Sequence, residues 1–337
     1  MYDIFSPAVR YVYPAHMRSG FIGEIMRDFI ILADVTCDLS EELRKRFGID
    51  DYIPGHVHFS DGRDFQTTLD WTNISREDFY KALSNKKMKI TTAPASPEEY
   101  YEIFRSYAKD GYDILSISLS SKISSTIDVA KSAAQRVMNE IPECNLYCLD
   151  SFRMSGSLGL LVILAYEMKA EGKTMREIID ALEQMKHKVH QMGPIDDLMF
   201  IARRGRISTG KAIMGSFAGV KPMGDCNSEG YVTVLTKVKG IKTALNATVE
   251  YLRIAAEDIE NNYVLITHSN REEYANILKD KIISELHPKD VLFSDVFDGC
   301  GTNIGPGMVC ATFIGAPISE DGMAEKEMMA RAVAAIK

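Results

Sequence analysis

A run of hydroxyl side chains in the first half of the chain is the part of the sequence best suited to bind a ligand. Residues 112–126 read Y-D-I-L-S-I-S-L-S-S-K-I-S-S-T, in which an apolar stretch that predicts a strand leads into the hydroxyls. Apolar residues then recur at helical spacing, so Ser124, Ser125 and Thr126 are expected at a helix N-terminus. Free backbone N–H groups and the positive end of the helix dipole point outward there, and added hydroxyl donors favour an anion. Ordinary capping of the helix by one serine is the alternative interpretation.

A second segment comes close to a nucleotide-binding loop. Gly205–Ala212 reads G-R-I-S-T-G-K-A, against the phosphate-binding pattern G-x-x-x-x-G-K-[ST]. Ala212 stands where the pattern has the hydroxyl that holds magnesium, and Arg206 and Ile207 do not suit a tight phosphate cradle. The departures argue against a nucleotide site.

A third segment is rich in glycine. Gly299–Gly307 reads G-C-G-T-N-I-G-P-G and precedes an apolar stretch that predicts a strand. Its glycines and proline predict a fixed backbone path, either as a rigid hairpin or as an interdomain turn. The functional interpretation is a backbone wall beside a ligand, with Thr302 and Asn303 as donors.

Hydrolase and metal chemistry find little support. No G-x-S-x-G is present, and no histidine is placed in a loop beside the serines. His56 and His58 would share one face of a strand, and His187 and His190 one face of a helix, but two histidines make an incomplete metal site. The cysteines are scattered and form no C-x-x-C pair, which indicates free thiols in a reducing compartment.

Composition limits the class of protein. The chain has 337 residues, of which 46% are hydrophobic and 26% charged, as is typical of a soluble globular protein with room for two domains. A net charge of −8 argues against nucleic acid as the main partner. No apolar run approaches the roughly 20 residues of a membrane span, and the first 28 residues lack a signal-peptide core, so we expect a cytoplasmic protein. Residues 1–28 are open to interpretation as a docking arm, a partner segment, or a vector-derived or mis-started end.

Alternating strand and helix signals predict the fold class. Strands are expected at residues 29–33, 52–59, 112–117 and 145–149, and helices begin after Ser40, Ser75, Ser96 and Ser124. Helices at 158–171 and from Thr174 to about His190 lead into a second unit, with strands at 231–238, 263–267, 291–297 and 308–314 and helices at 241–257 and 272–286.

This order predicts an α/β protein of two α/β domains, the first with a mostly parallel sheet flanked by helices. We expect an N-terminal extension at residues 1–28, a first domain at 29–155 and a second at 156–337. Asp34, Ser118–Ser121 and Asp150–Ser151 follow strands, and ligands of open α/β sheets bind at such strand ends.

Seven short motifs, read in order, resemble the DegV family of bacterial fatty-acid-binding proteins, from about Ile30 to the C-terminus. The motifs, each with the family pattern that it resembles, are D-V-T-C-D-L at 34–39 (D-S-T-x-D-L), I-T-T-A-P-A at 90–95 (T-S-x-P-S), S-S-K-I-S-S-T at 120–126 (S-S-x-L-S-G-T), L-D-S at 149–151 (a third strand end), R-R-G-R-I-S at 203–208 (G-G-R-I-S), V-K-P at 220–222 (I-K-P) and N-I-G-P-G at 303–307 (H-x-G-P-G).

The resemblance implies a fold in which the ligand lies in an interdomain crevice. One long-chain fatty acid would lie in an apolar tunnel, with its carboxylate facing the crevice. In the best understood members a separate fatty acid kinase phosphorylates the bound carboxylate to an acyl phosphate, so this chain would be a carrier and substrate-binding subunit, not an enzyme, with no cofactor besides the bound fatty acid.

Site residues follow from the resemblance by position. Arg206 is expected on the surface that meets the kinase. The residues expected at the fatty-acid head group are Thr91 or Thr92, Ser124 with its neighbour Ser125, and Asn303. Burying a sixteen-carbon chain at about 0.8 kcal/mol per CH₂ supplies on the order of 10 kcal/mol, far more than a few neutral hydrogen bonds contribute.

The sequence departs from the family pattern at five positions, all in these motifs. Val35, Ala93, Ser125, Arg204 and Asn303 replace a serine, a polar residue, two glycines and a histidine. Asparagine donates to a carboxylate but does not titrate near neutrality as histidine does. We therefore expect lipid binding with an altered head-group geometry.

Two other function classes stay open at this point. One is an enzyme that acts on a phosphorylated or acylated small molecule with the hydroxyl cluster and Arg206. The other is a regulatory protein that keeps the fold and binds a partner through its first 28 residues.

Overall fold

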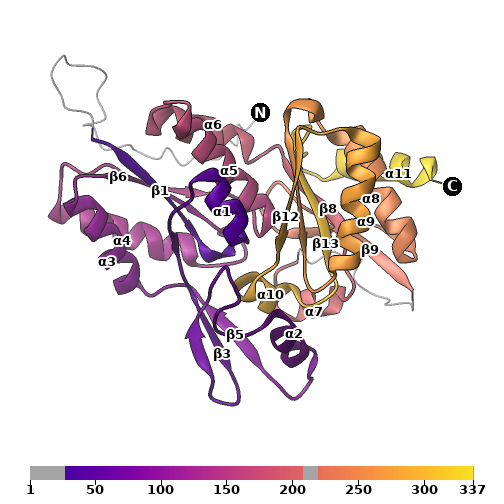
Figure 1. Cartoon of the computed structure of the whole chain (residues 1–337), viewed down its shortest axis with the longest axis horizontal. Coiled ribbons are helices and arrows are strands. Elements are labelled where there is room, and N and C mark those ends of the chain that lie inside the picture. The colour runs from indigo at the N-terminus through magenta and orange to yellow at the C-terminus, as the bar shows by residue number, and fades with distance from the viewer. Residues whose placement is uncertain (1–26, 208–218, 337) are drawn as a thin grey trace, which may run out of the picture.

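The computed structural model describes residues 27–207 and 219–336. Its first sheet is parallel throughout, which confirms the predicted mostly parallel sheet, and its strand order is β2-β1-β6-β7 (β1 and β6 are labelled in Figure 1). The strands are β1 (Phe29–Asp34), β2 (Tyr52–Ile53), β6 (Asp113–Ser118) and β7 (Leu146–Asp150). Helices cover both faces, which explains why β6 is buried along its whole length, its two serines included.

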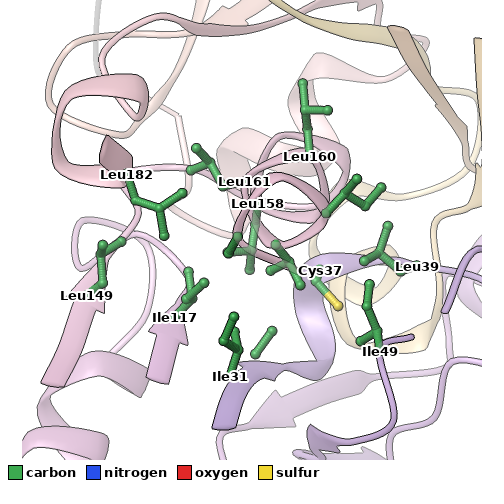
Figure 2. Packing of buried hydrophobic residues seen from close by; sticks show 14 of the residues in the cluster. Ile31, Cys37, Leu39, Ile49, Ile117, Leu149, Leu158, Leu160, Leu161 and Leu182 are labelled. Atoms are coloured by element: carbon green, nitrogen blue, oxygen red, sulfur yellow. The ribbon is translucent and has the colours of Figure 1, made fainter. Parts of the chain in front are cut away.

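The two faces of this sheet carry different helices. Leu32 and Ile114 share one apolar cluster with α3 (Pro97–Lys109) and α4 (Thr126–Glu140). On the other face, α1 (Glu41–Phe47), α5 (Gly156–Ala170) and α6 (Met175–Met185) pack on Ile31, Ile117 and Leu149, as Figure 2 shows for part of the cluster.

Local capping signals place the helix starts correctly. Ser96 and Thr174 each form a capping box with the glutamate three residues on, Glu99 and Glu177. The predicted end of the second of these helices is wrong. That helix, α6, stops at Met185, and His190 lies in a buried strand, β8 (Val189–Pro194), so His187 and His190 do not share a helix face.

The predicted strand at 52–59 is two strands. Pro54 and Gly55 interrupt it, and the second half joins a three-stranded antiparallel sheet of order β4-β3-β5. This sheet and helix α2 pack around Val57, Phe79 and Ile90, and we call residues 56–93 the small lobe. Its elements are β3 (His56–Phe59), β4 (Asp64–Gln66), α2 (Arg76–Ser84) and β5 (Ile90–Ala93).

His56 and His58 share a strand face, as predicted, and their ring centroids lie 6.3 Å apart. Each bonds a carboxylate of its own: His56 Nε2 lies 3.0 Å from Glu99 and His58 Nδ1 2.8 Å from Asp64. Among the described residues, no group of three or more potential metal ligands is found.

A second sheet of six strands has the order β10-β9-β8-β13-β11-β12. Only β11 and β12 pair in parallel, and the remaining pairs are antiparallel. One face packs on α8 (Ile241–Ala255), α9 (Glu272–Leu286) and α11 (Met323–Ala335). The strands other than β8 are β9 (Val220–Cys226), β10 (Val232–Lys239), β11 (Tyr263–His268), β12 (Asp290–Asp295) and β13 (Val309–Ile314).

Helix α5 lies between the two sheets (Figures 1 and 2). It contacts β1 of the first sheet and β8, β11 and β13 of the second. Nine of its fifteen residues are buried, on all sides of the helix, because apolar neighbours surround it. No helix in the described part of the chain is long and apolar enough to cross a membrane.

Candidate functional site

A cavity of about 230 Å³ lies where the first sheet, the small lobe and two short helices meet. The short helices are α7 (Leu198–Arg203) and α10 (Asp298–Ile304). The residues that line it come from the end of β1 and the segment after it (Asp34, Val35, Thr36), from the approaches to the small lobe (Ile53, Pro54, Gly55, Thr67), from β5 and the segment after it (Thr92, Ala93, Pro94, Ala95), from the first sheet and its helices (Tyr100, Leu119, Ile123, Ser124, Ser125, Thr126, Met154) and from the opposite wall (Ile201, Arg206, Val232, Gly299, Cys300, Asn303, Ile304).

Thr92 and Asn303 meet across this cavity. The side-chain amide Nδ2 of Asn303 donates to Oγ1 of Thr92 at 3.1 Å. The hydroxyl proton of Thr92 is therefore free to donate to a third group. Neighbouring residues of a strand point to opposite faces, so Thr91 points away from the cavity: it is exposed and does not line it. In the small sheet Thr91 pairs with His58. The structure thus brings Thr92 to the site, and Thr91 away from it.

The predicted hydroxyl cluster lies at the start of α4 and lines the cavity. Ser125 occupies the N-cap position but its side chain makes no capping hydrogen bond. Ser124 Oγ accepts from the Thr126 backbone N–H at 3.3 Å and lies 2.8 Å from Thr126 Oγ1. In these contacts Ser124 accepts from the backbone and does not donate to it, so hydroxyl protons at the start of the helix stay available for a ligand.

One cation lies among the described lining residues. Arg206 is half-buried, and its guanidinium donates from Nε to the Ile123 carbonyl at 3.1 Å and also bonds the Arg204 carbonyl. Arg204, which departs from the family pattern, donates to the Ile90 carbonyl at 2.8 Å, and burial lowers the pKa of its guanidinium. The rest of the glycine-lysine loop, from residue 208, lies outside the described residues.

Asp34 also lines the cavity, but its carboxylate is already bonded. It accepts from the backbone N–H groups of Thr36 at 2.9 Å and Leu119 at 2.8 Å, and from the Thr36 hydroxyl. Burial raises its pKa, and these donors partly offset that rise. Asp34 therefore joins the ends of β1 and β6.

The glycine-rich segment is a helix in its first part, which corrects the prediction of a hairpin or turn. Residues 298–304 form α10, and glycine lets it pack closely: a Cβ at Gly301 would lie 2.9 Å from Tyr80 Oη and 3.0 Å from a ring carbon of Phe79. Thr302 is buried and donates to the Asp298 carbonyl, so it is not a donor to the cavity. Asn303 lines the cavity, and its side-chain amide donates to Thr92.

A smaller cavity of about 30 Å³ adjoins the first. Four apolar residues line both: Met154, Ile201, Val232 and Ile304. Beyond them the walls include Ile195, Met308, Cys226 and Cys310. Sequence periodicity did not identify these residues, because they come from separate segments that only the folded chain brings together.

The arrangement favours a ligand with one anionic end and an apolar body. Neutral donors from Thr92, Asn303 and the start of α4 line the same cavity, and Arg206 also lines it. No histidine lies among the described lining residues, and burial raises the pKa of the Cys300 thiol, which thus stays protonated and weakly nucleophilic. These features suit binding better than acid–base or nucleophilic catalysis.

Comparison with known proteins agrees with this site. A family model described as "Uncharacterised protein, DegV family" matches residues 28–315. A DegV domain-containing protein of Caldanaerobacter subterraneus subsp. tengcongensis is 30% identical over 281 residues, which cover 83% of this chain and 96% of that protein.

Solved structures show the same fold. DegV of Bacillus subtilis, described as a fatty acid binding protein, is 25% identical with a TM-score of 0.71, covering 86% of this chain and 100% of that one. A DegV family protein of Thermus thermophilus, described by its fatty acid binding, has 24% identity and a TM-score of 0.76 over 86% of this chain and 100% of that one.

The B3 protein of Streptococcus pneumoniae fatty acid kinase, solved with linoleic acid, has 16% identity and a TM-score of 0.72 over 86% of this chain and 100% of that one. The Bacillus subtilis and Thermus thermophilus proteins are described by their fatty acid binding, as the sequence motifs imply for the family. The family-model match over most of the length, together with the relative of 30% identity, establishes that this chain belongs to the DegV family.

Proposed function

We propose that the protein binds one long-chain fatty acid, with the carboxylate between Thr92, Asn303 and Ser124 and the acyl chain in the two joined cavities. The observation that carries the proposal is the combination of linings: Thr92, Ser124 and Asn303 line the larger cavity, and four apolar residues line both it and the smaller cavity. Fatty acids bound in structures of the same fold support it.

The hydrogen bonds already made around the proposed head group leave hydroxyl protons free to donate, which favours a carboxylate over a neutral group. Asn303 occupies a lone pair of Thr92 Oγ1, so the Thr92 hydroxyl donates outward. Ser124 Oγ accepts from a backbone N–H, which leaves one hydroxyl proton in the Ser124–Thr126 pair for the ligand. Two outward donors, one from β5 and one from the N-terminus of α4, match the two oxygens of one carboxylate.

Mass spectrometry of the protein purified from a bacterial host tests the proposal. The native mass should exceed the chain mass by that of one fatty acid, which solvent extraction then releases and identifies. Thr92→Ala combined with Ser124→Ala should lose most of this ligand. Thr91→Ala is the matched control, because it removes the neighbouring hydroxyl from the exposed face of the same strand, and it should retain the ligand. A native protein without lipid that takes up no added fatty acid would refute the function.

We further propose that the protein presents the bound carboxylate to a separate kinase that forms an acyl phosphate. The fold shared with the Streptococcus pneumoniae kinase B3 protein and the half-buried Arg206 beside the head-group region support this step. Asn303→His, which restores the residue usual in the family, should raise the rate of acyl-phosphate formation by a cognate kinase with ATP. A native protein that already supports the full rate would show that Asn303 does not limit this step.

The same proposal includes a division into domains at residues 29–155 and 156–337, with the head group between them. It is supported by the two separate sheets, and Thr92 of the first part accepts a hydrogen bond from Asn303 of the second.

A further inference from the structure

We propose that Asp295, which lies outside both cavities, is a positioning residue for the head-group site: it holds the small lobe against the start of α10 and thereby keeps Thr92 within reach of Asn303. The inference rests on the proposed function and names a residue that would control discrimination of the carboxylate.

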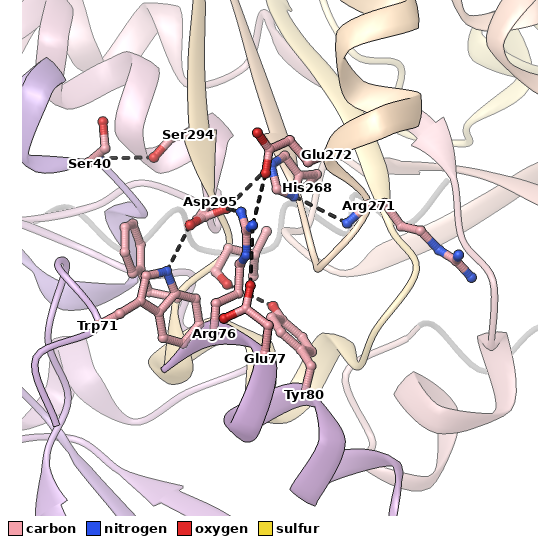
Figure 3. Close-up of polar contacts among 12 residues, drawn as sticks. Ser40, Trp71, Arg76, Glu77, Tyr80, His268, Arg271, Glu272, Ser294 and Asp295 are labelled. Atoms are coloured by element: carbon pink, nitrogen blue, oxygen red, sulfur yellow. Dashed lines mark hydrogen bonds and ion pairs between the residues drawn. The ribbon is translucent and has the colours of Figure 1, made fainter. Parts of the chain in front are cut away.

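The carboxylate of Asp295, the last residue of β12, is bonded mainly by side chains of the small lobe (Figure 3). Nε1 of Trp71 donates to Oδ2 at 2.7 Å, and Nη1 of Arg76 donates to Oδ1 at 3.0 Å. Nε2 of His268, on the adjacent strand β11, lies 3.3 Å from Oδ1. The Asp295 side chain is only 18% exposed, so its charge-assisted bonds are shielded from water and stronger than those of a surface ion pair.

Arg76 extends this contact to a second element. Its Nη2 donates to Glu272, the first residue of α9, at 2.8 Å. One arginine of the small lobe is therefore bonded both to the end of β12 and to the start of α9 (Figure 3). The lobe has a fixed orientation relative to the second sheet for this reason.

The same surface of the small lobe packs on α10. The Trp71 and Phe297 rings lie 5.1 Å apart, and Tyr80 Oη donates to the Val296 carbonyl at 2.7 Å. Gly301, one turn into α10, packs on Tyr80 and Phe79. Asn303 follows two residues later in α10. The helix that the small lobe packs on, and that Asp295 helps to hold in place, therefore carries the Asn303 side-chain amide.

The small lobe transmits its position to Thr92 because it is a single packed unit. Trp71 packs against the apolar cluster that contains Phe79 and Ile90, and Ile90 begins strand β5, which carries Thr92. Closely packed interiors shift as a unit, not side chain by side chain. Loss of the Asp295 bonds would thus displace Thr92 and Asn303 relative to each other without altering either residue.

The test compares binding of a saturated fatty acid with binding of the fatty alcohol of equal length. Asp295→Asn should weaken binding of the acid about tenfold, the scale of one lost hydrogen bond to a charged group, and weaken binding of the alcohol less, since a hydrogen bond to a neutral hydroxyl contributes less. Trp71→Phe keeps the ring against Phe297 but removes the N–H, so it should act in the same direction with a smaller effect. It also provides a second measurement if Asp295→Asn does not fold.

Glu285→Gln is the matched control, because it removes a carboxylate that bonds Arg253 at 3.0 Å between α8 and α9, away from the cavities. It should change neither affinity. A native protein that prefers the acid, with variants of Asp295 and Trp71 that keep the full preference, would overturn the positioning role and leave fatty-acid binding intact. An equal loss for acid and alcohol would also overturn it, since that result indicates a general structural role. A native protein that binds neither lipid would refute the proposed function and the inference with it.

Discussion

The amide nitrogen of Asn303 lies 3.1 Å from the hydroxyl oxygen of Thr92, and this contact joins the end of α10 to β5 across the cavity. Asn303→Asp keeps the size of the side chain but adds an anion beside the expected carboxylate. Repulsion should weaken fatty-acid binding by about tenfold or more near pH 7, and binding should recover as the pH falls and the added carboxyl takes up a proton. Dissociation constants measured at several pH values, with Asn303→Ala as the control, check this. A weakening that is equal at every pH and equal to that of the alanine variant would contradict it.

The acyl chain should respond to the wall shared by the two cavities. Ile304 lines both of them. Ile304→Phe places a larger side chain at this junction, so the bound lipid should shift toward shorter chains. Each methylene that no longer fits costs about 0.8 kcal/mol, or roughly a fourfold change in affinity. Mass spectrometry of the extracted lipid measures the shift. An unchanged chain-length profile would show that the acyl chain does not pass this residue.

Local signals in the sequence predicted much of the fold and part of the site. The capping boxes at Ser96 and Thr174 lie within four residues of chain, and they are present as predicted. The position of the hydroxyls at the start of α4 was also predicted from a pattern within a few residues of chain. Such features depend on neighbours in sequence, so the sequence alone identifies them.

Features that depend on tertiary contacts were not predictable. Motif position could not choose between Thr91 and Thr92, because that choice is set by which face of β5 meets α10. A helix at Asp298–Ile304 was missed because its glycines lower helix propensity, and close packing on Tyr80 and Phe79 compensates. Strand β9 (Val220–Cys226) contains proline and glycine and lacks alternation, but its pairing with β8 and β10 holds it extended.

A buried ion pair in the second sheet should make stability depend on pH. His190 Nδ1 lies 2.7 Å from Asp225 Oδ2, and its Nε2 lies 2.9 Å from the Ala316 carbonyl. Burial alone lowers the pKa of His190, but the Asp225 carboxylate outweighs it and raises the pKa above the ordinary value. The stabilisation is therefore fully present below the ordinary histidine pKa of about 6.5 and lost as the pH rises through the higher folded-state value.

His190→Gln should remove this dependence. The difference in Tm between the native protein and the variant should be largest at mildly acidic pH and shrink as the pH rises, which thermal unfolding across a pH series measures. A difference that grows toward alkaline pH would mean that the imidazole is neutral in the folded protein.

The close packing of α10 on the small lobe at Gly301 gives a prediction about stability. A methyl group at Gly301 would lie 2.9 Å from Tyr80 Oη and 3.0 Å from a ring carbon of Phe79. Gly301→Ala should lower the free energy of unfolding by about 1–3 kcal/mol through overpacking, although alanine is the better helix former. Urea unfolding measures this, with the exposed Ser106→Ala as the control. A stabilised variant would show that Tyr80 and Phe79 move aside without cost.

Helix α5 bears on how the chain is made. Its apolar surface is covered by β1 on one side and by β8, β11 and β13 on the other, and all three of the latter strands follow it in the sequence. When α5 has just been synthesised, the strands of the first sheet are complete, but the side of α5 that packs on the second sheet has no partner yet. That apolar surface stays exposed until β13 (Val309–Ile314), the last of these three strands in the sequence, has been synthesised. During this interval the nascent chain can bind chaperones or aggregate through the exposed surface of α5. A chain truncated anywhere within the second sheet would leave part of that surface exposed.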